Sequence, residues 1–425
     1  FESMPTGITN IKPEHFRKAF GVTDKGGNFA LYHATANNKV ANVKGIFDDL
    51  AGVAISPRSK AVLFANSKGN LELFRIDNEH PEISLGALWG EIWYESRQKP
   101  EYVWQSSAAN SDFEPKYSLT PLVFGTLKAT FYSMLFAVPL AIFGAIYTAY
   151  FMSAKMRSIV KPTIEIMAAL PTVILGFLAG LWLAPYLEKN LAGFFLIIVV
   201  VPTVIFFASL VWPKVSRSVR ERVPDGWESL LLIPVVCFGL WTSLALGAAI
   251  EIKFFAGNLP HWLNLQYGIS YDQRNSIVVG IAIGFAVIPT IFSISEDAVF
   301  GVPRTLTMGS LALGATPWQT VTRVILLTAS PGIFSAVMIG MGRAVGETMI
   351  VLMATGNTPI MDLNIFQGFR ALSANIAVEM PESEVNSTHY RILFLAALVL
   401  FLSTFFVNTL AEVVRQRLRK KYANL

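Results

Sequence analysis

Long apolar runs without a charged residue constrain the fold of this chain more than any other feature. The stretch from Leu191 to Trp212 contains no Asp, Glu, Lys or Arg. A helix crosses the hydrocarbon core of a bilayer, about 30 Å thick, with roughly 20 such residues. Only 15% of the residues are charged, whereas soluble domains carry about 25%. The sequence therefore predicts a multi-span membrane protein embedded in a lipid bilayer.

Seven apolar segments after residue 120 are expected to form an all-α polytopic membrane domain. They cover residues 121–151, 163–186, 191–213, 228–250, 276–296, 324–355 and 391–413. Their connections alternate between rich and poor in Lys and Arg. The basic set consists of Lys155, Arg157, Lys161, Lys214, Arg217, Arg220, Arg222, Arg304, Arg323, Arg415, Arg417, Arg419, Lys420 and Lys421.

This charge asymmetry predicts the orientation of the chain. Cytoplasmic loops of membrane proteins carry the excess of Lys and Arg, so we expect a cytoplasmic C-terminus. An odd number of spans then places residues 1–115 outside the cytoplasm, and we expect an additional span before this chain. The same basic residues account for the net charge of +5 without a nucleic-acid partner.

Residues 1–115 differ from the apolar remainder and are predicted to be a β-rich extracytoplasmic segment. Alternating residues predict strands at 51–56, 61–66 and 71–76, with turns at 57–60 and 67–70. The stretch VAISPRSKAVLFANSKGNLELFRI resembles a blade of a WD40-like propeller. A closed propeller needs several blades, so this segment is interpreted as the tail of a larger domain, with an unrelated β-meander as the alternative. Residues 116–425 are then the transmembrane domain.

A cytoplasmic loop at 297–323 holds the first motif. Small residues lead to Gly314, where glycine permits a sharp turn, and a short amphipathic segment follows. The stretch LALGATPWQTVTRVIL resembles the EAA loop of binding-protein-dependent ABC importer permeases, with Met308-Gly309-Ser310 in place of Glu-Ala-Ala. The resemblance implies that this loop docks on a separate ATPase subunit. The residues implied in docking are Gly309, Ser310, Ala312, Gly314, Ala315 and Trp318.

The second motif lies in the sixth apolar segment. Arg343 and Glu347 are four residues apart, which predicts that both lie on one face of a helix. Ionisable residues within a span usually line a path or pair with one another, and a guanidinium offers a planar fork of donors to an oxyanion. The carboxylate of Glu347 would either hold the arginine in place or accept a hydrogen bond from a protonated phosphate oxygen. The alternative is a buried ion pair that only sets helix register.

The segment GRAVGETM is similar to the signature of the PstC subunit of phosphate-specific ABC importers. This resemblance implies a phosphate path past Arg343, Glu347 and Thr348. The segments beginning at Pro121 and Ile164 also resemble the opening helices of these permeases, including the break at Leu170-Pro171-Thr172. Residues 191–250 then form an extra helical pair.

Two further acidic positions are singled out near the ends of spans. Glu165 stands where these permeases commonly have a glutamate, and it is a possible residue of the path. Glu296 and Asp297 are interpreted as a solvated span end.

The expected function is therefore that of a non-enzymatic permease subunit in a bacterial inner membrane. No nucleotide-binding Gly-x-x-x-x-Gly-Lys-Ser/Thr motif, metal-ligand spacing or catalytic motif occurs in the sequence, so no cofactor and no catalytic or metal site is expected in this chain. The resemblance implies that a partner subunit uses ATP, and that a second permease and an extracytoplasmic phosphate-binding protein take part. Alternatives are a permease for another oxyanion, a secondary transporter, and a membrane sensor or scaffold with an extracytoplasmic ligand domain.

Overall fold

The computed structural model describes residues 1–422 apart from positions 2, 16, 58, 78, 95–96, 109–112 and 215–227. The basic loop residues Arg217, Arg220 and Arg222 lie outside the described residues, as does Arg58 of a predicted turn. The chain divides into two compact units. The β-rich unit comprises Phe1–Val123 and Val378–Ala396, and the helical unit comprises Phe124–Ala377 and Ala397–Leu425.

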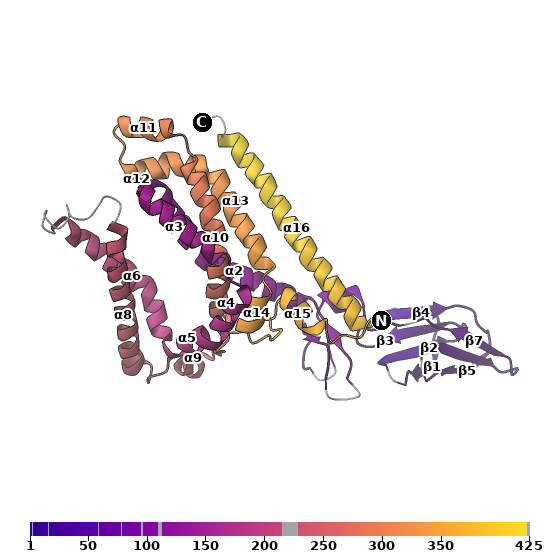
Figure 1. Ribbon diagram of the computed structural model, residues 1–425. Helices are drawn as coiled ribbons and strands as arrows, with labels where there is room; N and C mark the ends of the chain where they lie inside the picture. The colour runs from indigo at the N-terminus through magenta and orange to yellow at the C-terminus, as the bar shows by residue number, and fades with distance from the viewer. Residues whose placement is uncertain are drawn as a thin grey trace. The chain divides into compact units, whose positions relative to one another are not determined.

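Two antiparallel sheets in sequence order form most of the β-rich unit (Figure 1). The four-stranded sheet has the order β1-β2-β3-β4, the three-stranded sheet has the order β5-β6-β7, and β8 pairs with β9. The strand bounds are β1 Ile8–Pro13, β2 Ala19–Asp24, β3 Phe29–His33, β4 Asn38–Val43, β5 Leu50–Ile55, β6 Ala61–Asn66, β7 Leu71–Arg75, β8 Trp104–Gln105 and β9 Lys116–Tyr117.

One hydrophobic core joins the two larger sheets. Phe29 of β3 and Phe64 of β6 are fully buried and meet edge to face, with ring centroids 5.1 Å apart. Such pairing stabilises a core beyond the area that it buries. The predicted strands at 51–56, 61–66 and 71–76 are confirmed to within one residue. The described sheets are open meanders and do not close into a propeller.

The other elements of the described chain are helices, with π-helical turns at η1, η2 and η4 and a 3₁₀ turn at η3. Their bounds are α1 Leu85–Trp89, α2 Thr120–Ile146, η1 Tyr147–Phe151, α3 Ala154–Met167, α4 Thr172–Leu178, η2 Ala179–Leu183, α5 Ala184–Lys189, α6 Leu191–Val211, η3 Trp212–Lys214, α8 Glu228–Phe254, α9 Leu259–Tyr267, α10 Ser276–Phe300, α11 Arg304–Ala312, α12 Pro317–Thr320, η4 Val321–Ile325, α13 Leu326–Val345, α14 Met349–Ala354, α15 Leu372–Glu379 and α16 Thr388–Tyr422.

Six helices in the described part of the chain are long and apolar enough to cross a membrane. A seventh span results if α3 and the α4–α5 segment, which are bent by 82° at their junction, are counted as one. The predicted helical membrane domain is confirmed, but segment 163–186 is not a straight helix. Its chain leaves α3 after Met167 and starts again at Thr172, because Pro171 cannot donate the backbone hydrogen bond that would continue a helix.

The best-buried span is α10, which packs along α13 in the helical unit (Figure 1). Asn275 caps its first turn by accepting hydrogen bonds from the N–H groups of Ile277 and Val278. The predicted extra pair forms the adjacent helices α6 and α8. A Cβ on Gly247 would lie 2.3 Å from the Cα of Gly193, so only glycine permits this close approach.

Candidate functional site

Arg343 lies in the last turn of α13, within a membrane-spanning helix. Its Nη1 donates a hydrogen bond to Thr290 Oγ1 of α10 at 3.0 Å, and the side chain is partly buried. A guanidinium has five N–H donors, so donors remain for an anion besides the one that binds Thr290. The arrangement presents a fixed cation inside the helical unit.

Glu347 does not share a helix with Arg343, and the expectation of one continuous helical face is wrong. Helix α13 ends at Val345, and α14 begins at Met349. Glu347 lies in the break, where its Oε1 accepts a long hydrogen bond from the N–H of Ile350 at 3.4 Å. A carboxylate at this place compensates the exposed N–H groups of the helix that follows.

The break between α13 and α14 is held by further polar contacts. Ser373 donates to the carbonyl of Glu347 at 2.9 Å, and Thr348 donates to the carbonyl of Gly346 at 3.1 Å. Arg343 and Glu347 form no ion pair with each other in this described segment. The predicted path residues are therefore neighbours along the chain with separate partners.

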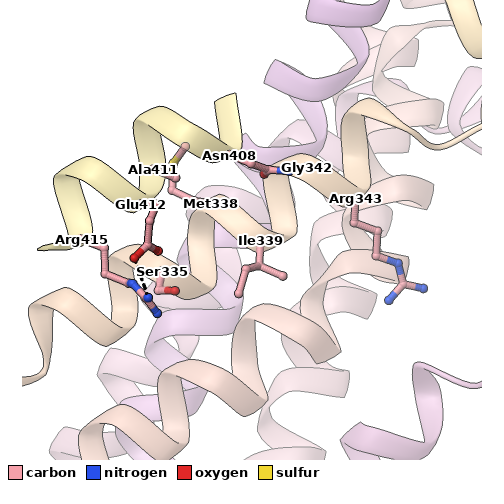
Figure 2. Close-up of a pocket in the computed structure, with 9 residues that line it drawn as sticks. All are labelled: Ser335, Met338, Ile339, Gly342, Arg343, Asn408, Ala411, Glu412 and Arg415. Atoms are coloured by element: carbon pink, nitrogen blue, oxygen red, sulfur yellow. Dashed lines mark hydrogen bonds and ion pairs between the residues drawn. The ribbon is translucent and has the colours of Figure 1, made fainter. Parts of the chain in front are cut away.

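A cleft of about 390 Å³ lies between α13 and α16. Figure 2 shows Arg343 at one side of it, with its guanidinium pointing away from the ion pair of Glu412 and Arg415. In that pair Arg415 Nη2 donates to Glu412 Oε1 at 2.8 Å. The cleft residues are Ser335, Met338, Ile339, Gly342, Arg343, Asn408, Ala411, Glu412 and Arg415.

The predicted coupling loop folds into α11 and α12. Between them Gly314 has a φ of +86°, a left-handed conformation that favours glycine. Thr316 and Gln319 form a capping box at the start of α12, and Ser310 and Thr320 join the two helices by a hydroxyl contact of 3.0 Å. The most exposed large apolar side chains of α11, α12 and the turn between them are those of Met308, Leu313 and Trp318.

The other predicted loop residues also lie on these two short helices or between them. Gly309, Ser310 and Ala312 belong to α11, and Ala315 follows the turn at Gly314. The loop therefore presents exposed apolar side chains on a compact helical pair.

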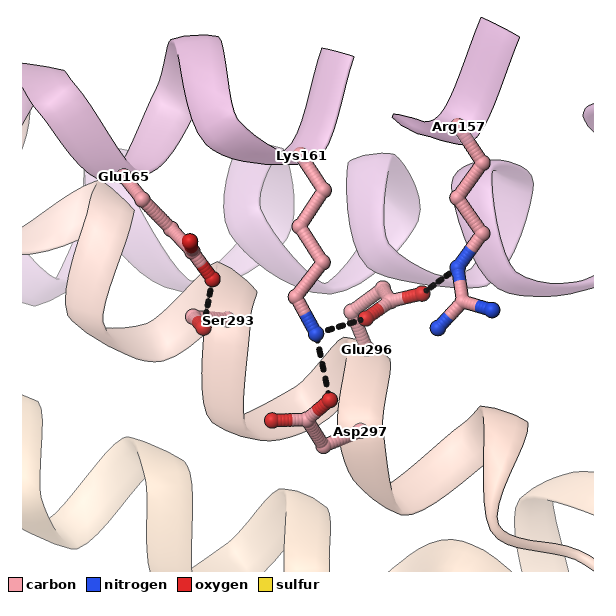
Figure 3. Close-up of polar contacts among 6 residues, drawn as sticks. All are labelled: Arg157, Lys161, Glu165, Ser293, Glu296 and Asp297. Atoms are coloured by element: carbon pink, nitrogen blue, oxygen red, sulfur yellow. Dashed lines mark hydrogen bonds and ion pairs between the residues drawn. The ribbon is translucent and has the colours of Figure 1, made fainter. Parts of the chain in front are cut away.

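A polar cluster connects α3 with α10 (Figure 3). Arg157 donates to Glu296 Oε1, and Lys161 Nζ lies 2.8 Å from Glu296 Oε2. Lys161 also binds Asp297. One helical turn further, Ser293 donates to Glu165 Oε1 at 2.8 Å.

This cluster corrects the interpretation of Glu296. Its side chain is 0% exposed, whereas that of Asp297 is 63% exposed. Only Asp297 is therefore a solvated span end. Glu296 is buried because α3 supplies two cations, and the guanidinium of Arg157 also lies over the ring of Phe300 at 3.4 Å.

A sequence signal for the cluster exists in the spacing of its members. Arg157, Lys161 and Glu165 recur every four residues, which places them on one helical face. The partners on α10 were not predictable from this spacing, because they come from a distant part of the chain. Glu165 itself lies beside Ser293, and its place in a substrate path stays a prediction.

Residues 137–420 match the family described as the binding-protein-dependent transport system inner membrane component. The chain belongs to this family. Members of the family are multi-pass inner-membrane permease subunits of ABC transporters, which are not enzymes themselves and which generally couple to an ATPase. The apolar helices of this chain agree with that assignment.

Individual relatives cover most of the permease part. The chain is 27% identical over 307 residues to the "Probable ABC transporter permease protein YqgH" of Bacillus subtilis, covering 72% of this chain and 74% of that protein. It is 31% identical over 232 residues to the "Phosphate transport system permease protein PstC 1" of Mycobacterium tuberculosis, covering 53% and 69%. A PstC of Mesorhizobium japonicum is 28% identical over 243 residues, covering 56% and 73%. The resemblance to PstC-type permeases is confirmed.

Proposed function

We propose that this binding-protein-dependent permease carries phosphate inward as half of a translocation path, with ATP hydrolysed by a partner subunit. The observation that carries the proposal is Arg343, a guanidinium inside a membrane-spanning helix and held by Thr290. A charge in a span is costly and is typical of a substrate path. Several relatives are named phosphate transport system permease proteins, which favours phosphate as the anion.

Glu347 and Thr348 are the proposed companions of Arg343. The break after α13 interrupts the helix and places the carboxylate of Glu347 just before α14, where it accepts from the N–H of Ile350. Non-helical backbone at membrane depth is tolerated where it lines a water-filled cavity or is buried in protein. We place the narrow part of the path at this break, where a protonated phosphate oxygen would donate to Glu347.

The coupling loop from 297 to 323 is the proposed ATPase contact. Exposed Met308 and Trp318 on the two short helices, and Leu313 in the turn between them, suit a hydrophobic groove on a partner. Phosphate would arrive from an extracytoplasmic binding protein, and a second permease would complete the path. In this proposal the β-rich unit lies outside the cytoplasm and the C-terminus lies inside, and the chain itself holds no cofactor.

The experiment is the variant Arg343→Lys in the assembled transporter. Lysine keeps the charge but loses the planar fork, so we expect phosphate uptake to fall by about tenfold or more, as for loss of a charge-assisted hydrogen bond. The amount of ATPase subunit that co-purifies should not change. Arg417→Lys on α16 is the matched control, since Arg417 is exposed and lies outside the cleft.

The outcomes separate the competing functions. Normal phosphate uptake by Arg343→Lys contradicts the role of Arg343. Uptake of sulfate or molybdate in preference to phosphate by the unmodified transporter would identify a different oxyanion. Absence of a co-purifying ATPase would favour a sensor or scaffold.

A further inference from the structure

The polar cluster between α3 and α10 joins the two helices through a buried carboxylate. Glu296 is fully buried and has two cationic partners on α3, Arg157 and Lys161. Removal of one partner from a buried ion pair leaves an uncompensated charge, which strongly disfavours separation of the two helices. At this level α3 and α10 are therefore expected to move as one body.

At one end of this pair of helices, α10 is followed along the chain by the proposed ATPase contact. Helix α10 ends at Phe300, three residues after Asp297, and α11 of the coupling loop begins at Arg304. The guanidinium of Arg157 lies over the ring of Phe300. Asp297 of the cluster and the first residue of α11 are thus seven positions apart, so a displacement of α11 by an ATPase would reach the polar cluster through a short segment of chain.

The other end leads to the break that contains Glu347. Beyond the bend at Pro171, α4 packs against α14 at a glycine. A Cβ on Gly176 would lie 2.9 Å from the carbonyl oxygen of Met349, the first residue of α14. Glu347 stands two residues before that helix. Close backbone packing leaves little room for sliding, so a tilt of α3 and α4 would displace the start of α14.

We propose that the polar cluster is the rigid link that transmits motion of the coupling loop to the break at Glu347, with Glu296 as its positioning residue. The link runs through α10, the cluster, α3, the bend and α4 to α14. Contiguous packed elements of this kind carry coupling between distant sites. The inference rests on the proposed function for the roles of the loop and of Glu347.

Loss of a link lowers anion uptake per ATP hydrolysed, whereas loss of a merely stabilising cluster lowers hydrolysis and uptake together. The test uses the complete transporter in proteoliposomes, with the binding protein and ATPase present. Glu296→Gln keeps the shape of the side chain but removes its charge. We expect ATP hydrolysis to be mostly retained, while anion uptake per ATP falls about tenfold, the size of typical coupling between two sites.

Two controls bracket this variant. Lys155→Met removes a cation from the same helix at an exposed position, and it should leave uptake per ATP unchanged. Asp297→Asn removes the exposed member of the cluster and should have a smaller effect than Glu296→Gln. An unchanged ratio in Glu296→Gln, or a parallel loss of hydrolysis and uptake, overturns the link.

A second experiment does not depend on the folding of Glu296→Gln. The sequence has one cysteine, Cys237, so Lys161→Cys and Asp297→Cys can be bridged by a short bifunctional thiol reagent in a Cys237→Ser background. The two substitutions remove Lys161 and Asp297 from the cluster, so a rigid link predicts that uptake per ATP falls in the unbridged variant and is restored when a methanethiosulfonate bridge joins the two helices. Inhibition that is reversed by reduction would show that α3 and α10 must separate during transport, and would overturn the proposal.

Failure of the link and failure of the proposed function remain distinguishable. Uptake per ATP is measured with whichever oxyanion the unmodified transporter carries. A transporter that prefers another anion contradicts the phosphate proposal but still tests the link. Normal coupling in Glu296→Gln, together with loss of phosphate uptake in Arg343→Lys, would refute the link alone.

Discussion

Three ionisable side chains in the helical unit take polar partners from another helix or from a loop. Arg343 donates to Thr290, and Glu296 is neutralised by α3. Lys128 of α2 donates to the carbonyls of Asp362 and Asn364 at 2.7 and 2.8 Å. Desolvation of a charge in a membrane protein is offset only by such contacts. Each of these residues thereby joins segments far apart in sequence.

Glu114 of the β-rich unit illustrates the same rule outside the membrane. The N–H of Ala36 donates to His33 Nδ1, so His33 Nε2 carries the proton that faces Glu114 Oε1 at 3.0 Å. Thr35 donates to Glu114 Oε2 at 2.6 Å. Burial by itself raises the pKa of Glu114, but the hydrogen bonds from His33 and Thr35 outweigh it, and the pKa lies below its ordinary value of 4.5.

A pH-dependent stability of the β-rich unit follows from this lowered pKa. The unfolded state binds the proton more readily, so Glu114 contributes stability above pH 4.5, and the contribution is lost as the pH falls through the folded pKa. We expect the difference in unfolding temperature between the unmodified protein and Glu114→Gln to shrink as the pH falls below 4.5. Thermal unfolding followed by tryptophan fluorescence measures it. A difference independent of pH would contradict this explanation.

At the scale of elements, glycines decide how closely the bent span approaches α14. A Cβ on Gly180 of η2 would lie 2.5 Å from the carbonyl oxygen of Met353. A backbone atom cannot move aside as a flexible side chain can, so the two elements must separate to admit even a methyl group. The bend and the break are therefore packed against each other through backbone.

Substitution of this glycine should disturb both stability and transport. We expect Gly180→Ala to destabilise the protein by about 1–3 kcal/mol, as overpacking does, and to lower uptake. The control is Gly144→Ala on α2, where the nearest atom would be a ring carbon of Phe292 at an ordinary 3.5 Å. Melting temperature in detergent and uptake in proteoliposomes are the measurements. Equal effects of the two substitutions would rule out the backbone contact as the cause.

At the scale of the whole molecule, the sidedness of the two ends remains a prediction from the distribution of Lys and Arg. In a Cys237→Ser background, Ser67→Cys in a turn of the β-rich unit should react with a membrane-impermeant maleimide in intact cells. Arg417→Cys near the end of α16 should react only after permeabilisation, because the positive-inside rule places it in the cytoplasm. Gel-shift labelling measures both, and the reverse pattern would invert the orientation.

Local patterns in the sequence were sufficient for the membrane class and the three central strands, while the resemblance to PstC-type permeases implied the break at Leu170-Pro171-Thr172. Apolar length and alternation act within a few residues, so they are readable without a structure. The same local reasoning predicted that one helix contains both Arg343 and Glu347, but α13 ends at Val345. The four-residue spacing of Arg343 and Glu347 did not reveal that the helix ends between them.

Tertiary structure alone decided the partners of the charged residues. Glu296 looked like a solvated span end because it adjoins a basic, polar connection, yet it is buried against Arg157, 139 positions away. Arg343 donates its hydrogen bond to Thr290, 53 positions away, and not to Glu347. Helical spacing determines only which side chains share a face. The packing of another helix against that face supplies the partner, and this depends on the whole fold.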